Sequence, residues 1–426
     1  MSDVFLTGFI SRHRLDDRNI DIDETLESFF QEMDRGLTGE SSSLKMIPTY
    51  ISDEIVPAHN RKVIVIDAGG TNLRVALVSF DSNGFPVIED LNKYSMPGIQ
   101  QEISATQFFD TIGEYLAPFM NKSDRIGFCF SYPAEITENR DGRLIHWTKD
   151  IKVPELEGQL IGRGLLESLG ESGKDKKITI LNDTIATLLA GRAQSSPENF
   201  SNFVGLILGT GTNMAYVEKN ANISKLYTSN ADGSQAINME SGGFSLAPSS
   251  DFDRQLDAAT INPGDYLFEK MIAGLYRGKL VLLALQAAAR ENLFSAPYAS
   301  KILAIAELEA VDADNFLRNS TESPLLTDTI TDVDYDCAAK IINAIYRRAA
   351  KLTAISIAAA VIRSASSGDK AVCVNIDGST YYKSIGFREM VEEFLSQILG
   401  TRKIAYKLIH VDNAPVIGAA IGGLAS

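Results

Sequence analysis

The chain is predicted to fold as an α/β protein built from two related halves. Short β-branched runs alternate with segments of helical periodicity, which is typical of α/β architecture. A pair of apolar runs joined by a Gly-rich turn occurs twice, in residues 62–80 and 199–218. The length of 426 residues also exceeds what one core of about 150 residues usually takes. We therefore expect two domains.

The first half is expected to open with an amphipathic helix over residues 21–35, where four large apolar side chains recur at helical spacing. A strand over residues 62–67 leads into the turn Ala-Gly-Gly-Thr-Asn, and a second strand over residues 73–80 leaves it. Further strands are expected over residues 126–130 and 178–181, and helices over residues 107–119 and 183–193.

The second half repeats this design and then becomes mainly helical. A strand over residues 203–208 precedes the turn Gly209-Thr-Gly-Thr-Asn213, and a strand over residues 214–218 follows. The remaining expected elements are helices over residues 264–277, 279–290, 301–308 and 335–363, a strand over residues 371–376, and a last helix beginning near Pro415. The Gly-containing segment 274–280 is interpreted as a helix break. Since no low-complexity linker separates the halves, a hinge is expected between them.

Composition and charge exclude several classes of protein. Apolar residues make up 45% and charged residues 22%, as in ordinary globular chains. Forty basic against 55 acidic residues give a net charge of −15, which disfavours nucleic acid and anionic membranes as partners. The N-terminal residues lack the apolar core of a secretory signal, and no apolar stretch reaches the ~18 residues of a membrane span. A cytoplasmic protein is expected, with Cys129, Cys337 and Cys373 as reduced core residues.

The two Gly-rich turns are candidate phosphate sites. Asp67 stands at the end of the first strand, followed by two glycines and Thr71, so a carboxylate, approachable backbone N–H groups and a hydroxyl lie together. The second turn offers a similar group of approachable backbone N–H groups and hydroxyls. Either turn alone could merely reverse the chain, but two of them could hold a polyphosphate from both sides. Neither the P-loop GxxxxGK[ST] nor a GxGxxG turn before a helix is present.

A set of polar residues between the turns is compatible with a polyol ligand. Asp183 follows an apolar strand and opens a helix, where an N-cap role is common but where a base for phosphoryl transfer would also fit. Each of the other candidates could singly be a solvated side chain. Together they offer the hydroxyl, amide and carboxylate groups that sugar hydroxyls require: Ser131, Thr148, Lys149, Glu240 and Glu269.

These segments, in this order, resemble the hexokinase family from about residue 20 to the C-terminus. The first turn, 67–74, is similar to the first phosphate loop of that family, and 209–213 to its second. Residues 130–133, 147–149, 182–184, 238–240 and 262–271 resemble its sugar-site segments, and 375–381 its adenosine-side strand and loop. The resemblance implies a two-domain actin-like ATPase (ribonuclease H-like) fold with a hinge-bound cleft.

The resemblance also implies an activity and a role for each residue. The expected reaction is ATP-dependent phosphorylation of a hexose, with glucose the first expectation, at the primary 6-hydroxyl. Asp183 is the expected general base, assisted by Lys149, and ATP and Mg²⁺ are the expected cofactors, with Asp67 as metal ligand. The sugar contacts would be Ser131, Thr148, Lys149, Asn182, Asp183, Asn213, Glu240 and Glu269. The nucleotide contacts would be Asp67, Gly69, Gly70, Thr71, Asn72, Arg74, Gly209, Thr210, Gly211, Asp377 and Gly378.

The same resemblance implies the domains. Residues 53–183 with 413–426 would form a small domain, and residues 1–52 with 184–412 a large one. Their closure would exclude the water that competes with the sugar hydroxyl. The expected partner is the hexose, without nucleic acid or membrane, and the chain is expected to be a monomer or homodimer.

The chain departs from the family pattern at two places. Ser241 stands where the family usually has Trp, and Pro415 lies in the last phosphate turn, where it supplies neither an N–H donor nor a hydroxyl. Three other readings are considered. The related bacterial glucokinases carry a Cys/His zinc motif that this chain lacks, and an actin-like filament protein would have no use for Ser131, Thr148, Lys149 and Glu269. A catalytically silent sugar sensor would keep most of the site, and because of Pro415 it stays open as the alternative.

Overall fold

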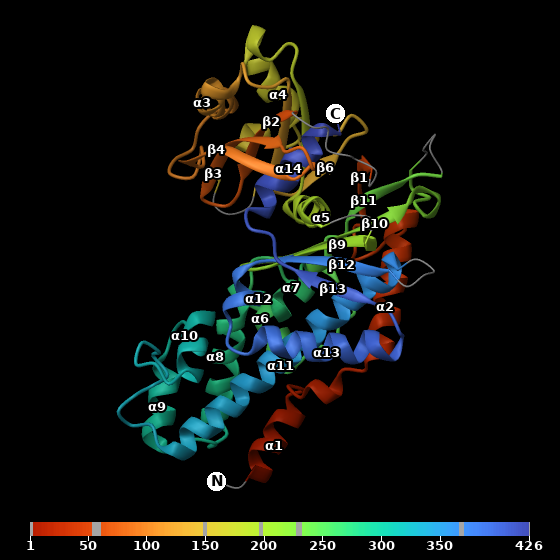
Figure 1. Ribbon diagram of the computed structural model, residues 1–426. Helices are drawn as coiled ribbons and strands as arrows, with labels where there is room; N and C mark the ends of the chain where they lie inside the picture. The colour runs from red at the N-terminus through yellow and green to blue at the C-terminus, as the bar shows by residue number, and fades with distance from the viewer. Residues whose placement is uncertain are drawn as a thin grey trace.

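Two β-sheets with helices around them make up the molecule, as the computed structural model shows (Figure 1). The structure describes residues 3–52, 61–147, 151–195, 199–226, 232–365 and 370–425. The N-terminal helix α1 (Asp3–Arg12) lies at one end of the molecule, and the C-terminus lies beside the sheet at the other end (Figure 1).

The first sheet has five strands in the order β4-β3-β2-β5-β8. The pairs β2–β3 and β3–β4 are antiparallel, whereas β2–β5 and β5–β8 are parallel. Every residue of β2 after Lys62 is buried, because β-branched side chains fill both faces of this central strand. The strands are β2 (Lys62–Ala68), β3 (Asn72–Phe80), β4 (Pro86–Ser95), β5 (Arg125–Phe130) and β8 (Lys177–Leu181).

The second sheet repeats this order and adds one strand. Its order is β1-β11-β10-β9-β12-β13, with β9–β10 and β10–β11 antiparallel and β9–β12 and β12–β13 parallel. The predicted duplication is confirmed, since β9 occupies the place of β2 and the two Gly-rich turns follow equivalent strands. The strands are β1 (Ile47–Ser52), β9 (Phe200–Leu208), β10 (Thr212–Lys219), β11 (Ser234–Asn238), β12 (Ala371–Asp377) and β13 (Tyr406–Ile409).

Two helices lie between the sheets, α5 (Asp183–Gln194) and α14 (Ala414–Leu424). They pack on each other, and α14 also packs on β2 and β5 while α5 packs on β9. The approach is close because glycine stands at the contacts: a Cβ on Gly418 would lie 1.9 Å from the Ala186 carbonyl oxygen, and one on Gly127 1.8 Å from the Ala419 carbonyl oxygen. The Gly/Ala-rich end of the sequence is thus explained by backbone packing.

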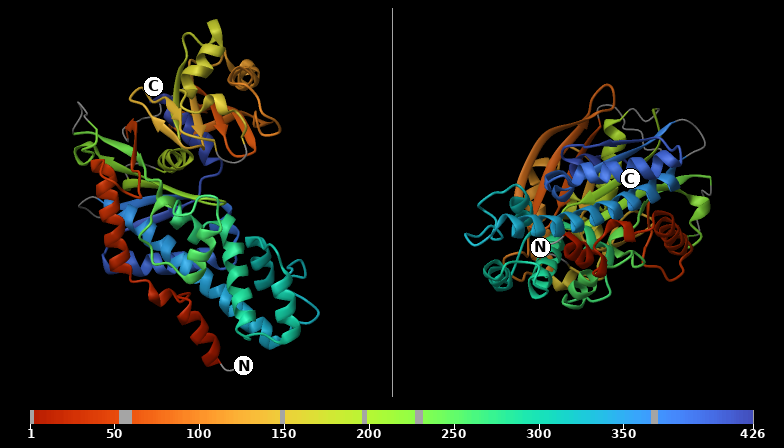
Figure 2. Two further views of the ribbon diagram at one scale, coloured as in Figure 1. Left: turned by 180° about the vertical axis from the view of Figure 1, so that it is seen from behind. Right: turned by 90° about the horizontal axis from the view of Figure 1, so that it is seen from below.

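A layer of long helices covers the far face of the six-stranded sheet, and a helical group extends beyond it (Figure 2). Helix α11 runs through both regions, with Ile355 and Ile357 in the core beneath the sheet and Ile341 in the core of the helical group. The helices are α2 (Ile22–Thr38), α6 (Asp251–Ala258), α7 (Leu267–Ile272), α8 (Gly274–Arg290), α9 (Ala296–Ala304), α10 (Ala310–Leu317), α11 (Asp332–Ser364), α12 (Ser379–Lys383) and α13 (Phe387–Thr401).

The five-stranded sheet is covered by α3 (Ala105–Leu116) and α4 (Ile161–Ser168), with a small hairpin of β6 (Ala134–Ile136) and β7 (Gly142–Leu144) beside them. Helix α3 begins with a capping box formed by Ser104 and Gln107, which satisfies the first N–H groups of the helix. No helix within the described ranges is long and apolar enough to cross a membrane.

Two sequence predictions of helix boundaries were wrong. The break expected within residues 274–280 lies instead at Ala273, whose extended backbone separates α7 from α8. Helix α8 continues through Gly278, where a Cβ would lie 2.2 Å from the Leu308 carbonyl oxygen, so this glycine serves close packing. The helix expected over residues 301–308 ends at Ala304 as part of α9, and the segment after it packs against α8.

The three cysteines are buried, as predicted, and we expect their thiols to be unreactive in the native protein. Burial raises the pKa of Cys337 to about 12 and that of Cys373 to about 11, and the pKa of Cys129 is also raised. Because the thiolate is the nucleophile, alkylation by iodoacetamide at pH 8 should be negligible before unfolding. Mass spectrometry should find three modified residues only after denaturant is added, and rapid modification of the native chain would contradict the burial.

Candidate active site

The first Gly-rich turn joins β2 to β3 at the edge of a cleft between the two sheets. The Gly69 N–H donates to the Asn72 carbonyl oxygen at 3.1 Å, which closes the turn. The hydroxyl of Tyr132 donates to the carbonyl oxygens of Gly69 and, at 3.3 Å, Gly70. Thr71 and Asn72 are exposed at the tip. The turn is therefore held from behind while its front remains open.

Asp67 lies just behind this turn and is paired with Arg74. The two residues are opposite each other in the β2–β3 register, and the Arg74 Nε donates to Asp67 Oδ2 at 2.6 Å. Arg74 Nη1 also reaches Asn413 Oδ1 at 3.4 Å, so it connects the first turn to the start of α14. The Asp67 side chain is almost fully buried. A buried carboxylate and a guanidinium thus lie at the base of the first turn.

The second Gly-rich turn joins β9 to β10 and is packed tightly against the segments around it. The Gly209 carbonyl oxygen accepts hydrogen bonds from the Gly274 N–H at 2.9 Å and the Thr380 hydroxyl at 2.7 Å. A Cβ on Gly378, whose φ is +123°, would lie 2.2 Å from the Leu208 carbonyl oxygen. Only glycine permits this approach. Thr210 remains exposed at the tip of the turn.

Asp377 and Gly378, the predicted adenosine-side residues, lie at the end of β12 beside this second turn. Strand β12 is the parallel neighbour of β9, so its carboxyl end reaches the same edge of the sheet as the turn. The Gly378 N–H donates to Asp377 Oδ1 at 2.7 Å. Ligands of open α/β sheets bind at such carboxyl ends, and the position is consistent with a nucleotide site.

Asp183 is the first residue of α5, at the junction of β8 with that helix. Asn182 is the N-cap, and its Oδ1 accepts from the Thr184 N–H at 2.9 Å and the Thr184 hydroxyl at 2.6 Å. The capping role considered for Asp183 therefore belongs to Asn182. The charge of Asp183 raises the pKa of both Cys129 and Glu240, because its carboxylate lies near both.

The buried thiol of Cys129 lies close to the carboxylates of Asp67 and Asp183. Cys129 is opposite Asp67 in the parallel β2–β5 register. Burial is the main cause that raises the pKa of its thiol, and the charges of Asp67 and Asp183 add to it. Ser131, two residues further along, lies within hydrogen-bonding reach of the same thiol. Around Cys129 of β5 thus lie Asp67, the predicted metal ligand, Asp183, the predicted base, and Ser131, a predicted sugar contact.

On the wall of the cleft formed by the six-stranded sheet, three polar side chains form one hydrogen-bond network. Asn213 Nδ2 donates to Asn238 Oδ1 at 2.8 Å and to Glu240 Oε1 at 3.2 Å, and Asn238 Nδ2 donates to the same Glu240 oxygen at 2.7 Å. Burial raises the pKa of Glu240, while the hydrogen bond from Asn238 opposes the shift. Glu240 has a left-handed backbone, with φ +55°. The network fixes its carboxylate toward the cleft at a cost in backbone strain.

Glu269 lies next to this network, on α7. Its Oε2 accepts from the Thr212 N–H at 2.9 Å, directly after the second Gly-rich turn. Burial raises the pKa of the neighbouring Tyr266 to about 12, and the charges of Glu240 and Glu269 contribute. Glu269 therefore connects the second turn with the carboxylates of the sugar-site segments.

Sequence reasoning missed several residues at the site. A cavity between the walls is lined by Asn182 and Glu240 and by eight residues without an assigned role, namely Thr49, Phe130, Tyr132, Ala134, Ile136, Ile180, Leu181 and Asn238. Tyr266, with φ +51°, was also missed. Asn238 and Tyr132 belong to the segments that resemble the family, but no sequence signal singled out Thr49, since it enters from β1. The expected contacts Thr148 and Lys149 lie outside the described residues.

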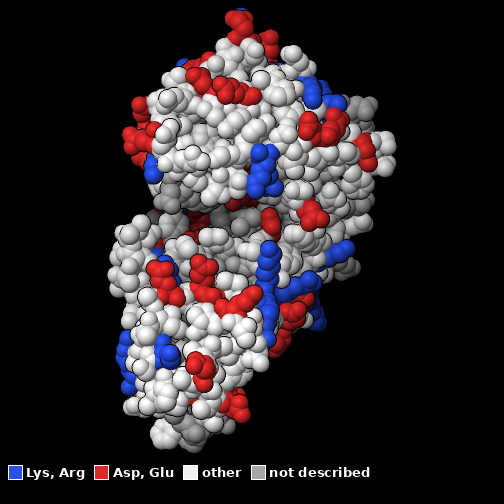
Figure 3. Space-filling view, turned by 90° about the vertical axis from the view of Figure 1, so that its left-hand side faces the viewer, with Lys and Arg blue, Asp and Glu red and all other residues white. Residues whose placement is uncertain are grey.

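The donor set fits a magnesium nucleotide. Mg²⁺ is usually held by one or two carboxylates together with phosphate oxygens, and Asp67 offers one carboxylate beside the first turn. At the second turn, a Cβ on Gly211 would lie 2.7 Å from Glu269 Oε2, so any side chain at this position would displace the Glu269 carboxylate. Figure 3 shows a hollow between the two halves of the molecule, with acidic side chains on its floor.

Comparison with known proteins identifies the family. Two family models, both described as hexokinase, match residues 8–193 and 203–425. The chain belongs to the hexokinase family. Hexokinase-1 of Spinacia oleracea is 30% identical over 426 residues, covering 92% of this chain and 84% of that protein. Human hexokinase-2 is 31% identical over 411 residues, covering 88% of this chain and 44% of that protein, so the chain spans under half the length of the mammalian hexokinases it matches.

Solved hexokinases share the fold. Schistosoma mansoni hexokinase complexed with glucose superposes with a TM-score of 0.81 over 100% of both chains, at 24% identity. A bacterial hexokinase from Thermus thermophilus gives a TM-score of 0.54 over 85% of this chain, at 16% identity. These likenesses confirm the predicted actin-like architecture of the hexokinases.

The two departures from the hexokinase pattern have structural explanations. Ser241 is buried, and its N–H donates to Asn213 Oδ1 at 3.1 Å, while a Cβ on the following Gly242 would lie 3.0 Å from the Thr212 carbonyl oxygen. A compact turn thus lies against the network of Asn213, Asn238 and Glu240 at the position where the family pattern described above has Trp. Pro415 lies in the first turn of α14, where its missing N–H needs no intrahelical partner.

Proposed function

We propose that this chain transfers the γ-phosphoryl group of ATP to the primary 6-hydroxyl of a hexose, with glucose as the first candidate. The observation that carries the proposal is the arrangement of Asp183: it lies at the start of α5, near Glu240 in the opposite wall and near Cys129, whose partner in the β2–β5 register is Asp67 behind the first Gly-rich turn. A carboxylate between a phosphate site and a polyol site suits a general base for phosphoryl transfer.

In the proposed mechanism the chain supplies position, charge and a proton acceptor. Asn182, Asn213, Glu240, Glu269 and Ser131 hold the sugar hydroxyls, and Thr148 and Lys149 are proposed to join them. Asp183 takes the proton from the 6-hydroxyl as that oxygen forms its bond to the γ-phosphorus and the bond to the bridging oxygen of ADP breaks. Mg²⁺, when bound with Asp67 and the phosphates, neutralises negative charge on the transferred group.

The residues assigned to the nucleotide divide between two turns. Gly69, Gly70, Thr71, Asn72 and Arg74 would contact the phosphates from the five-stranded sheet. Gly209, Thr210 and Gly211 would contact them from the other side, with Asp377 and Gly378 toward the adenosine. We further propose that residues 53–183 with 413–426 move as a small domain against the rest and close on the sugar, which would exclude water from the γ-phosphoryl group.

The direct test is a coupled assay of ADP release with Mg²⁺ and ATP in the presence of glucose, fructose, mannose or a non-sugar polyol such as glycerol. Sugar-dependent turnover, absent with glycerol, is the expected result and would also rank the hexoses. A sugar-induced rise in melting temperature without turnover would overturn the transfer activity and leave a sugar-binding protein.

Replacing Glu269 by Ala is expected to weaken hexose binding about ten- to hundredfold, since a hydrogen bond to a charged group contributes about 1.5–3 kcal/mol. Nucleotide affinity should change less. Calorimetric titration with glucose and with an ATP analogue measures both. Because Glu269 also accepts from the Thr212 N–H at 2.9 Å, Glu269→Gln is the second variant, as it retains an acceptor there. Equal losses for both ligands in the Gln variant would contradict the sugar role.

A further inference from the structure

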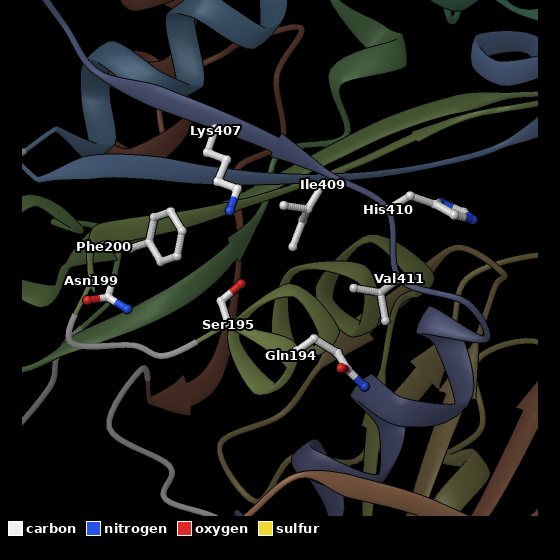
Figure 4. Close-up of a pocket in the computed structure, with 8 residues that line it drawn as sticks. All are labelled: Gln194, Ser195, Asn199, Phe200, Lys407, Ile409, His410 and Val411. Atoms are coloured by element: carbon white, nitrogen blue, oxygen red, sulfur yellow. The ribbon is translucent and has the colours of Figure 1, made fainter.

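A second pocket lies where the chain passes between the two sheets, away from the proposed active site. It has a volume of about 480 Å³, within the range of small-ligand sites. We call it the hinge pocket and define it by its lining residues, Gln194, Ser195, Asn199, Phe200, Lys407, Ile409, His410 and Val411. Figure 4 shows these side chains around the open space.

The walls of the hinge pocket come from two segments in which the chain passes from one sheet to the other within the described residues. Gln194 and Ser195 end α5, which follows the five-stranded sheet, and Phe200 begins β9 of the six-stranded sheet. Lys407 and Ile409 belong to β13 of the six-stranded sheet, and the chain then passes through Val411 into α14, which packs on β2 and β5. All eight lining residues fall within residues 184–412, the proposed large domain, and Val411 lies two residues before Asn413, where the chain crosses to α14.

The polar groups facing the pocket suit an anion. The Lys407 ammonium and the Ser195 hydroxyl approach the same space from opposite walls (Figure 4). The Ser195 Oγ lies 3.6 Å from Cys373 Sγ, and the charge of Lys407 lowers the pKa of that thiol, so ammonium and hydroxyl are near one sulfur. Within the described part of the chain Lys407 has no ion pair, although the chain carries a net charge of −15.

The remaining wall is apolar. The Phe200 ring and the Ile409 side chain border the space beneath Lys407, and the buried Val411 closes it on the α14 side (Figure 4). His410 does not contribute its ring, because the ring turns away: Nδ1 lies 3.1 Å from the Ile376 carbonyl oxygen and Nε2 lies 3.3 Å from Asp412 Oδ1. A flat, weakly polar ring beside one anionic group would match this surface.

We propose that the hinge pocket binds a small organic anion, consisting of a phosphate or carboxylate group held by Lys407 and Ser195 and a ring held by Phe200 and Ile409. Since Val411 closes the pocket two residues before the chain crosses to α14 at Asn413, such a ligand restrains this crossing and opposes closure on the sugar. The coupling to sugar binding, but not the anion site, rests on the proposed function.

The anion site is tested by calorimetry of the full chain with phenyl phosphate, benzoate, inorganic phosphate and neutral benzyl alcohol. Saturable binding of phenyl phosphate or benzoate is expected, and the stronger of the two identifies the anionic group. Lys407→Met should abolish it, whereas Lys301→Met, an exposed lysine on α9, should not. No binding to the wild-type chain, equal binding of benzyl alcohol, or binding that survives Lys407→Met would each overturn the proposal.

The coupling is tested by titrating glucose with and without the bound aryl anion, using the fluorescence of Trp147, the single tryptophan. The apparent dissociation constant for glucose should rise about fivefold or more in the wild-type and Lys301→Met chains. It should not change in Lys407→Met. An unchanged constant at saturating anion would overturn the coupling. A wild-type chain with no glucose signal would count against the proposed function, and calorimetry would still decide the anion site.

Discussion

Asp183→Asn is expected to lower the rate of hexose phosphorylation by about 10²- to 10⁴-fold, the usual contribution of a general base. The amide matches the carboxylate in shape but cannot accept the proton of the attacking hydroxyl. Asn182, rather than Asp183, caps α5 through Thr184, so the helix start should survive the change. The loss should therefore appear in kcat, with the dissociation constant for glucose nearly unchanged.

The measurement combines the coupled assay with a glucose titration monitored by Trp147. This residue contacts Tyr132, with ring centroids 4.9 Å apart, and Tyr132 lines the cavity beside Glu240. Asp110→Asn, at an exposed position of α3, is the matched control and should keep full activity. If Asp183→Asn retained more than about a tenth of the wild-type rate, the assignment of the base would be wrong.

Much of the fold could be predicted because its signals are local. The strands on either side of both Gly-rich turns were placed correctly, since β-branched runs bounded by glycine are strong strand signals. Strands β1, β4, β6, β7, β11 and β13 were not anticipated. The alternating, largely exposed β4 and the four-residue β13 have no continuous apolar run, and β1 contains Pro48. Their pairing with distant strands decides their conformation.

The predicted site residues were recognised because they lie in segments that resemble the family. Thr49, which the sequence analysis missed, comes from a segment outside these. Thr49 reaches the cavity because β1 pairs with β11, and its hydroxyl donates to the Ala236 carbonyl oxygen at 2.8 Å. A threonine in a short strand carries no sign of that position. The hinge pocket is similarly invisible in sequence, because Ser195 and Lys407 are brought together only when β12 pairs with both β9 and β13.

The glycines illustrate the same limit. Glycines are abundant near the C-terminus, but only the structure shows which of them packs against backbone. Gly418 faces the backbone of α5, and a Cβ there would lie 1.9 Å from the Ala186 carbonyl oxygen and 2.3 Å from the carbonyl carbon. Neither atom is the end of a flexible side chain. The contact can be relieved only by separating α5 from α14.

Gly418→Val is consequently expected to destabilise the protein by about 3 kcal/mol or more, at the upper end for overpacked cores. Calorimetry should show a lower melting temperature, or an absence of folded protein. Gly400→Ala is the control, because nothing lies within 4 Å of the added Cβ and the position belongs to α13. That change should be neutral or stabilise by up to about 1 kcal/mol.

The second consequence of Gly418→Val concerns activity. Helix α5 carries Asp183 at its first residue, and α14 begins next to Asn413, which accepts from Arg74 of the first Gly-rich turn. Separating the two helices therefore displaces the base relative to the phosphate site, and a displacement of about 1 Å can cost about 10²-fold in rate. Below its melting temperature, the variant should lose activity while Gly400→Ala keeps it. A folded Gly418→Val protein with wild-type kcat would show that the α5–α14 contact does not position Asp183.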